Sequence, residues 1–244
     1  MREGRLWTAA AAAPAVAAGF HLLAALRSKR SLHPTGIGYR GWLVVGDDHP
    51  GRPEVPLFRP GTAYPALVRF SRGAGMPEPL PDALGVAVKL PDAYGPGNDQ
   101  DLLLTSSTDR PLLRRLLFPA TSFVRGTFST ALPYELGGKR VVLLLVPAHS
   151  GSDQPAGAGI RRGRGALAEL DAAAVGLRFK LRTASSFGPS QPVATLTADQ
   201  LLSPEQTEAL RFNPWTTGPG IRPAGWLNLL RDTAYKASQR GRPC

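Results

Sequence analysis

The chain has 244 residues, of which 43% are hydrophobic and 19% charged, a balance typical of a globular protein and not of a disordered one. This length suffices for one domain with a substantial core, and the single cysteine, Cys244, excludes an intrachain disulfide, which is compatible with a cytoplasmic location. The net charge of +11 suits an anionic partner, but the sequence has no zinc-finger spacing, no aromatic-interleaved basic strand and no heptad zipper, so we expect no nucleic-acid partner.

The first 30 residues are predicted to form a helical segment of their own, followed by one domain over residues 31–244. From Leu6 to Leu26 the chain carries no formal charge and consists mostly of alanine and leucine. Three interpretations stay open: a signal peptide cleaved near Ala17, a weak membrane anchor, or an alanine-rich helix, broken at Pro14, whose second half packs on the domain. We favour the packed helix in a cytoplasmic protein, with peripheral membrane contact of the N-terminus as the second interpretation.

Apolar segments separated by turn-rich stretches fill the middle of the chain and predict strands. Between them, residues 111–123 have helical spacing with a break at Pro119, and residues 151–165 form a loop rich in glycine and arginine. The predicted strands are 38–45, 66–71, 84–90, 101–106, 141–146, 177–183 and 193–197.

Two helices are predicted towards the C-terminus. Ser203, Pro204 and Gln206 form a capping box that opens the first, and Pro223 starts the second, which ends at Gly241. Together with the strands, this order predicts an α+β fold: a closed antiparallel β-barrel with an N-terminal helix, helices between strands and a C-terminal helix.

Arg231 and Tyr235 stand four residues apart on the last predicted helix, so they share one face and the guanidinium can reach the phenol oxygen. A neighbouring cation favours the phenolate over the phenol, which otherwise holds its proton up to a pKa of about 10. Tyrosinate is a hard anionic ligand suited to ferric iron. The pair is a candidate iron site, although an arginine and a tyrosine at this spacing more often form ordinary surface packing.

Several motifs resemble those of the haem catalases and follow the same order along the chain. Towards the C-terminus, the motifs similar to the catalase segment that delivers the proximal tyrosine are Phe212-Asn213-Pro214, Pro219-Gly220-Ile221-Arg222-Pro223 and Arg231-Asp232-Thr233-Ala234-Tyr235. The upstream matches are Arg30-Ser31-Leu32-His33-Pro34-Thr35-Gly36, Ala66-Leu67-Val68-Arg69-Phe70-Ser71, Asp82-Ala83-Leu84-Gly85-Val86-Ala87-Val88-Lys89 and Leu117-Phe118-Pro119-Ala120-Thr121-Ser122-Phe123. The chain thus resembles a small catalase-like haem peroxidase, of the mini-catalase branch of this superfamily.

The resemblance implies a catalase-like barrel that binds haem b, with the C-terminal helix as a cap over the haem. Tyr235 is then the metal ligand, with Arg231 beside it, and Phe118 stacks on the porphyrin. The arginines expected to pair with the haem propionates are Arg30, Arg69 and, in the tail, Arg240 or Arg242.

His33 is the candidate acid–base residue, because a neutral imidazole can take a proton from peroxide and return it to the leaving oxygen near neutral pH. Ser71 resembles the family's serine that orients this histidine. At Thr105 the chain departs from the family, which has an asparagine that donates a hydrogen bond to peroxide; a threonine hydroxyl can turn to a backbone carbonyl instead. This difference favours a peroxidase with weak catalase activity, acting on hydrogen peroxide or organic hydroperoxides with a small organic electron donor.

Two alternatives on the same fold stay open. A hydroperoxide isomerase typically has threonine immediately before the distal histidine, where this chain has Leu32. A degenerate barrel without haem chemistry would have no reason to keep both the Arg–Tyr and the Arg–His pair. An unrelated hydrolase finds no support in the sequence, which lacks Gly-x-Ser-x-Gly, a phosphate-binding loop and paired zinc-ligand spacing. The sequence identifies neither the electron donor nor the oligomeric state.

Overall fold

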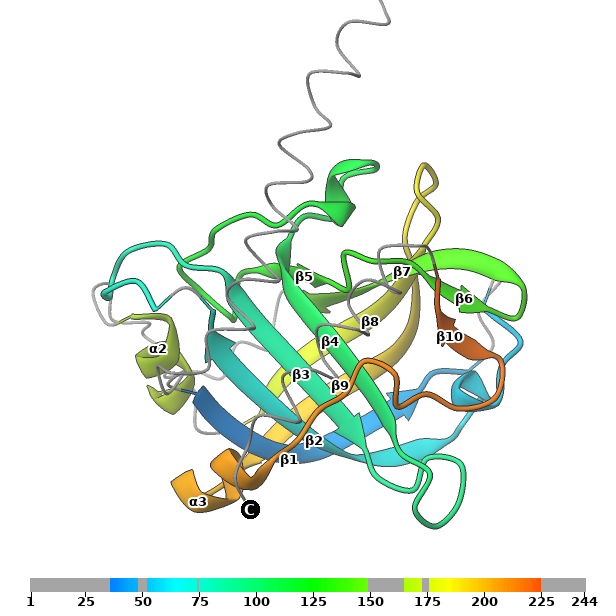
Figure 1. Cartoon of the computed structure of the whole chain (residues 1–244), viewed down its shortest axis with the longest axis horizontal. Coiled ribbons are helices and arrows are strands. Elements are labelled where there is room, and N and C mark those ends of the chain that lie inside the picture. The colour runs from blue at the N-terminus through cyan, green and yellow to red at the C-terminus, as the bar shows by residue number, and fades with distance from the viewer. Residues whose placement is uncertain (1–35, 48–51, 74, 149–164, 173–175, 225–244) are drawn as a thin grey trace, which may run out of the picture.

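The computed structural model describes residues 36–47, 52–73, 75–148, 165–172 and 176–224, and within this part eight strands close into an antiparallel barrel (Figure 1). The order round the barrel is β1-β2-β3-β4-β5-β7-β8-β9, and β9 pairs with β1 again. These strands are β1 Gly36–Val45, β2 Ala63–Arg72, β3 Leu84–Leu90, β4 Gln100–Ser107, β5 Thr127–Ser129, β7 Lys139–Pro147, β8 Leu177–Ala184 and β9 Gln191–Leu201. A short extension continues the sheet beyond β7 with β6 Tyr134–Leu136 and β10 Ile221–Pro223.

Inward and outward residues alternate along the barrel strands, because successive side chains of a strand point to opposite faces. In β2, Val68 and Phe70 are fully buried, whereas Arg69 and Ser71 on the other face are half-buried. The ring of Phe70 meets that of Phe123 edge-on, with 5.2 Å between the centroids. The barrel interior is therefore a packed core of apolar side chains, and a ligand of this barrel has to bind elsewhere.

A bulge in β1 helps the barrel to close. The register of β1 with β9 shifts between Arg40 and Gly41, and a Cβ added at Gly41 would lie 1.9 Å from the backbone oxygen of Thr197. Only glycine fits so close an approach of two backbones. The bend lets β1 pair with β2 along one edge and with β9 along the other.

In the described part of the chain, two short α-helices pack on the outside and the end of the barrel (Figure 1). Helix α2, Ala166–Ala172, buries Leu170, whose backbone oxygen accepts a hydrogen bond from the hydroxyl of Tyr39 at 3.0 Å. Helix α3, Pro204–Ala209, has the predicted capping box, with Ser203 as N-cap and Gln206 returning the bond. This helix lies beside β1.

Several predictions about helices were wrong or fall outside the described residues. Residues 111–123 form no α-helix: they hold a single 3-10 turn, η2 Leu113–Arg115, in a loop. Pro223 is the last residue of β10, so the last predicted helix does not begin there, because the fixed backbone of proline suits the edge of this short ladder as well as a first helical turn. The N-terminal segment 1–30 and the last predicted helix lie outside the described residues. Among the residues that are described, no helix is long and apolar enough to cross a bilayer.

Candidate functional site

The residues predicted for the site divide into two groups. The candidate acid–base residue His33 and the candidate iron ligand Tyr235 lie outside the described residues, together with the arginines Arg30, Arg231 and Arg242. The structure places the other group, which consists of Arg69, Ser71, Thr105 and Phe118.

Ser71 and Thr105 lie in one row across the outer face of the barrel. Ser71 pairs with Gly85 of β3, and Gly85 pairs with Thr105 of β4. The two side chains therefore emerge on the same face two strands apart, at a separation of about 10 Å. The row continues to Gly36 of β1 on one side and to Ser129 of β5 on the other. The strand register thus brings together residues that are far apart in the sequence.

The strip around this row is lined by small residues. The outward positions of β3 here are Gly85 and Ala87, and Gly36 lies opposite Ser71. A Cβ added at Gly85 would lie 3.1 Å from the hydroxyl oxygen of Ser71, and one at Gly36 would lie 2.9 Å from the guanidinium of Arg69. Longer side chains at these two glycines would crowd Ser71 and Arg69, so only small residues fit at this part of the strip. A planar macrocycle such as haem requires a face without bulky side chains, and the residues present fit it.

Arg69 supplies a half-buried cation at the edge of this strip, two residues before Ser71 on the same face of β2. Burial lowers the pKa of Arg69, the charge of Glu208 raises it in part, and Arg211 lowers it again. The guanidinium stays protonated at neutral pH, because arginine loses its proton only in strongly alkaline solution. It can therefore pair with a carboxylate that lies across the strip.

Thr105 and Phe118 flank the far end of the row. The hydroxyl of Thr105 donates to the backbone oxygen of Leu84 at 3.4 Å, so it turns to a carbonyl as the sequence suggested it could. Phe118 is tied to β4, because its N–H donates to the backbone oxygen of Ser106 at 3.0 Å, while its side chain is 37% exposed. An exposed aromatic ring on the loop after β4 can stack on a ligand.

A buried ion pair that the sequence did not reveal anchors the chain leading to the predicted iron ligand. The carboxylate of Asp101 lies 2.8 Å from the ammonium of Lys89 and accepts a hydrogen bond of 2.7 Å from the N–H of Asn213. Burial raises the pKa of Asp101, and Lys89 and Asn213 lower it in part. The bonds fix the Phe-Asn-Pro motif against β4. A lone aspartate opening an apolar strand was the one available sign of this role.

Gln100 forms a second set of hydrogen bonds to the same segment. Its side-chain oxygen accepts hydrogen bonds from the hydroxyl of Tyr94 at 2.9 Å and from the N–H of Gly218 at 3.3 Å. Gln100 is fully buried, so these bonds stabilise the segment strongly. The segment that precedes β10 is thereby held across the first residues of β4 (Figure 1).

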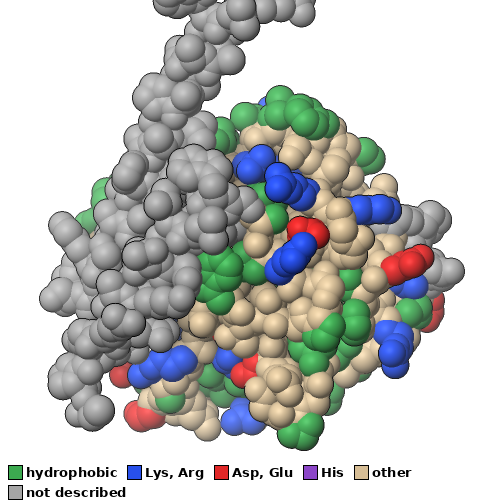
Figure 2. Space-filling view, turned by 45° about the vertical axis from the view of Figure 1, so that its right-hand side comes forward, with side chains coloured by type: hydrophobic (Ala, Val, Ile, Leu, Met, Phe, Trp, Pro, Cys, Tyr) green, Lys and Arg blue, Asp and Glu red, His purple; other side chains and the backbone are tan. Residues whose placement is uncertain are grey.

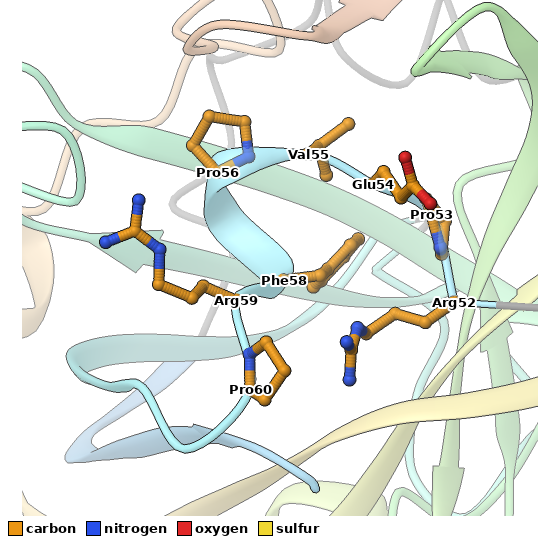
Figure 3. Close-up of a pocket in the computed structure, with 8 residues that line it drawn as sticks. All are labelled: Arg52, Pro53, Glu54, Val55, Pro56, Phe58, Arg59 and Pro60. Carbon is orange, nitrogen blue, oxygen red and sulfur yellow. The ribbon is translucent and has the colours of Figure 1, made fainter. Parts of the chain in front are cut away.

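No group of three or more metal-ligating side chains occurs among the described residues, and the predicted iron ligand lies outside them. Two hollows open elsewhere on the surface. One, of about 310 Å³, is lined by residues 52–60, where the ring of Phe58 lies between the side chains of Arg52 and Arg59 (Figure 3). The other, of about 440 Å³, lies between residues 94–99 and 215–219. Neither includes the Ser71–Thr105 row.

The comparisons with known proteins bear on the fold. No protein-family model and no curated protein matches this chain. Solved structures match over most of it. The barrel has the catalase fold. A bacterial catalase superposes with a TM-score of 0.58 at 16% identity, over 91% of this chain and 60% of its own.

Two further catalases agree. A fungal catalase gives a TM-score of 0.56 at 14% identity, over 90% of this chain and 62% of its own. Catalase A from Saccharomyces cerevisiae gives 0.56 at 12% identity, over 84% of this chain and 58% of its own. The chain thus spans about 60% of the length of these catalases. At such identities the likeness shows the fold alone.

Proposed function

We propose that the chain is an enzyme that binds haem b on the outer face of β2–β4 and cleaves peroxides as a peroxidase. The observation that carries this proposal is the row of Ser71, Gly85 and Thr105, with Arg69 beside it. Ser71 and Thr105 were selected from different parts of the sequence, and the strand register pairs both with Gly85. The substrates would be hydrogen peroxide or an organic hydroperoxide, together with a small organic electron donor.

Each residue of the proposed site has a distinct task. Haem, when bound, supplies the redox chemistry of peroxide cleavage. Tyr235, as the phenolate favoured by Arg231, would be the protein's ligand to the iron. His33 would hold and move the proton between the peroxide oxygens, and the hydroxyl of Ser71 would orient its ring.

The cations of the site bind and position the cofactor. Arg30, Arg69 and Arg242 would pair with the propionates, because a guanidinium binds a carboxylate through two parallel hydrogen bonds. Arg69 already lies at the edge of the small-residue strip, half-buried on β2. Phe118 would stack on the porphyrin from the loop after β4.

The hydrogen bond of Thr105 favours a peroxidase over a fast catalase. Its hydroxyl carries one proton, which is directed to the backbone oxygen of Leu84. To donate to peroxide, the hydroxyl would have to give up that bond. We therefore expect slow disproportionation of hydrogen peroxide, alongside turnover with organic donors.

The first test is the absorption spectrum of the full chain after haem reconstitution, compared with Tyr235→Phe. We expect a Soret band with a ferric high-spin pattern in the parent and its loss or displacement in the variant. Tyr64→Phe is the matched control, because the Tyr64 hydroxyl is committed to the backbone oxygen of Pro56 and lies outside the proposed site. Absence of a Soret band in the parent would reject haem binding altogether.

A second test concerns the acid–base residue. His33→Ala should lower peroxidase turnover by about 100-fold or more, within the usual contribution of a positioned acid–base group, while the Soret band persists. His49→Ala, outside the catalase-like motifs, should leave turnover unchanged. Equal turnover in both variants would remove His33 from the mechanism without touching the haem site.

A further inference from the structure

Two loops lie together at one end of the barrel (Figure 1), and both carry exposed apolar side chains. One surrounds η2 after β4, and the other is the hairpin between β8 and β9. In the first loop Leu112 is 58% and Leu113 38% exposed, and in the hairpin Phe187 is 76% exposed. We call these three residues the apolar tip. Figure 2 shows hydrophobic side chains gathered along the upper edge of the described part, where the two loops lie.

Hydrogen bonds join the two loops into one unit. The N–H of Leu112 donates to the backbone oxygen of Ser186 at 3.0 Å. The guanidinium of Arg114, only 1% exposed, donates to the backbone oxygen of Ser185 at 3.0 Å and to that of Asp109 at 2.9 Å. A buried cation with partners in both loops holds them together, so the apolar tip is presented rigidly.

The backbone at Leu112 adds a second unfavourable feature at the same position. Its φ of 66° with ψ of −45° is a conformation that residues with a side chain rarely adopt. Strained backbone of this kind is energetically costly and concentrates at functional positions. Here the strain holds a leucine side chain out in water, where burial within the barrel gives nothing in return. The exposed side chain itself therefore has a use.

The charges around the apolar tip identify the kind of partner. Residues 107–118 and 182–190, which include the two loops, contain a single acid, Asp109, and four arginines. Arg114 is buried and Arg182 lies 3.8 Å from Asp109, so the arginines left to face a partner are Arg110, which is exposed, and Arg115, which is half-buried. Leucine and phenylalanine beside such arginines match the boundary of an anionic bilayer, where the apolar groups enter the acyl region and the cations meet the headgroups. A second copy of the chain would instead bring arginines against arginines.

We propose that the apolar tip inserts into the surface of an anionic membrane and docks the barrel on it by this end. The net charge of +11 acts in the same direction by attracting the chain to such a surface. The docking surface consists of loop residues on the barrel and needs neither haem nor the N-terminal segment, so it stands apart from the proposed function.

Vesicle co-sedimentation of the full chain tests the proposal. We expect binding to phosphatidylcholine vesicles that contain phosphatidylglycerol and little binding to phosphatidylcholine alone. The double variant Leu112→Asn with Phe187→Ser removes two apolar side chains. Its partitioning should fall about tenfold or more. Leu201→Ser is the matched control, because Leu201 is 53% exposed at the end of β9, outside both loops, and should bind as the parent does.

A site-specific probe distinguishes insertion of the apolar tip from attachment through another part of the chain. Replacement of Cys244 by serine and of Phe187 by cysteine leaves one thiol for an environment-sensitive dye. The emission should shift to the blue on anionic vesicles. No shift, or unchanged vesicle binding of the double variant, would overturn the proposal in favour of attachment elsewhere. A parent dimer that the double variant converts to a monomer, without vesicle binding, would instead show an interface between two copies.

Discussion

The barrel has two different outer faces over one kind of interior. On the inside, Phe70 of β2 and Phe179 of β8 are equally buried. On the outside, β8 exposes Arg178 and Lys180 to water; we call this the charged face. The small-residue face on β2–β4 is half-buried or buried, and its residues are Ser71, Gly85, Ala87 and Thr105.

The difference between the two outer faces indicates which residues stabilise the fold and which are available for a function. The inward positions of the strands under both faces need only apolar side chains of suitable size. Small side chains on an outer face contribute little to that core, and between Ser71 and Thr105 they leave no long side chain of the kind that suits contact with water. The small-residue face is therefore the part of the barrel suited to being covered by a ligand.

The largest expected effect concerns the Lys89–Asp101 ion pair, which holds the segment before β10 against β4. Asp101→Asn leaves Lys89 partly buried with only Asp99 for a partner, and should cost about 3 kcal/mol of unfolding free energy, the low end for a broken buried pair. Lys180→Ala on the charged face should change it by less than about 0.5 kcal/mol. Urea denaturation measures both. Equal losses of unfolding free energy in the two variants would mean that the ion pair stabilises the fold no more than an exposed lysine does.

The second prediction concerns a larger side chain on the small-residue face. Gly85→Leu places a large side chain between Ser71 and Thr105, and haem affinity should fall about 10- to 100-fold, as expected from overpacking of about 1 to 3 kcal/mol. Lys180→Leu puts the same side chain on the charged face and should leave affinity unchanged. Haem titration followed at the Soret band gives both values. Undiminished affinity of Gly85→Leu would place the haem somewhere else on the molecule.

The third prediction restores a donor to the small-residue face. Thr105→Asn supplies an amide that can reach past the backbone oxygen of Leu84, and disproportionation of hydrogen peroxide should rise about tenfold, a fraction of what one well-placed donor contributes. Thr195→Asn on β9 is the control. Oxygen evolution measures the rate. A gain in both variants, or in neither, would show that Thr105 does not limit this reaction.

The smallest expected effect is a pH dependence at the edge of the small-residue face. Burial raises the pKa of Asp99, but the N–H of Asp92 and the ammonium of Lys89 outweigh it and lower the pKa below its usual value of 3.8. Because the folded state favours the carboxylate, its stabilisation is complete above about pH 5 and is lost as the pH falls below 4. Asp99→Asn should thus cost about 0.5 kcal/mol near neutral pH.

The check on this prediction is the difference in unfolding free energy between parent and Asp99→Asn, measured across the acid range. The difference should vanish as the pH falls through the folded-state pKa of Asp99. The exposed Asp199 on β9 offers the control, Asp199→Asn. A difference for Asp99→Asn that is constant with pH would assign the effect to packing and not to the charge.

Most of the barrel could be predicted from the sequence because its long strands are apolar segments bounded by turn-rich stretches. The predicted strand at 84–90 coincides with β3, and those at 66–71, 141–146 and 177–183 lie within β2, β7 and β8. The three-residue strands β5 and β6 went unpredicted because they are too short to show a period. The helical spacing of 111–123 was misleading, since Arg114 is buried for its bonds to the neighbouring hairpin.

The candidate site shows a different limit. Motifs could select Ser71 and Thr105 one at a time, but their common row depends on the register of three strands, which nonlocal pairing sets. The pairing of Lys89 with Asp101 likewise follows from strands whose facing residues no local pattern reveals. The sequence therefore predicts which residues could serve in the site, and the fold determines which of them lie next to each other across the strands.

The most direct test of the haem-binding face is paramagnetic broadening of backbone amide NMR signals when ferric haem is added to the full chain. The proposal predicts that the signals of Ser71, Gly85 and Thr105 broaden or disappear at one equivalent, while those of Arg178 and Lys180 persist. Broadening centred on β8, or none on either face, would contradict the assignment of the small-residue face as the haem site.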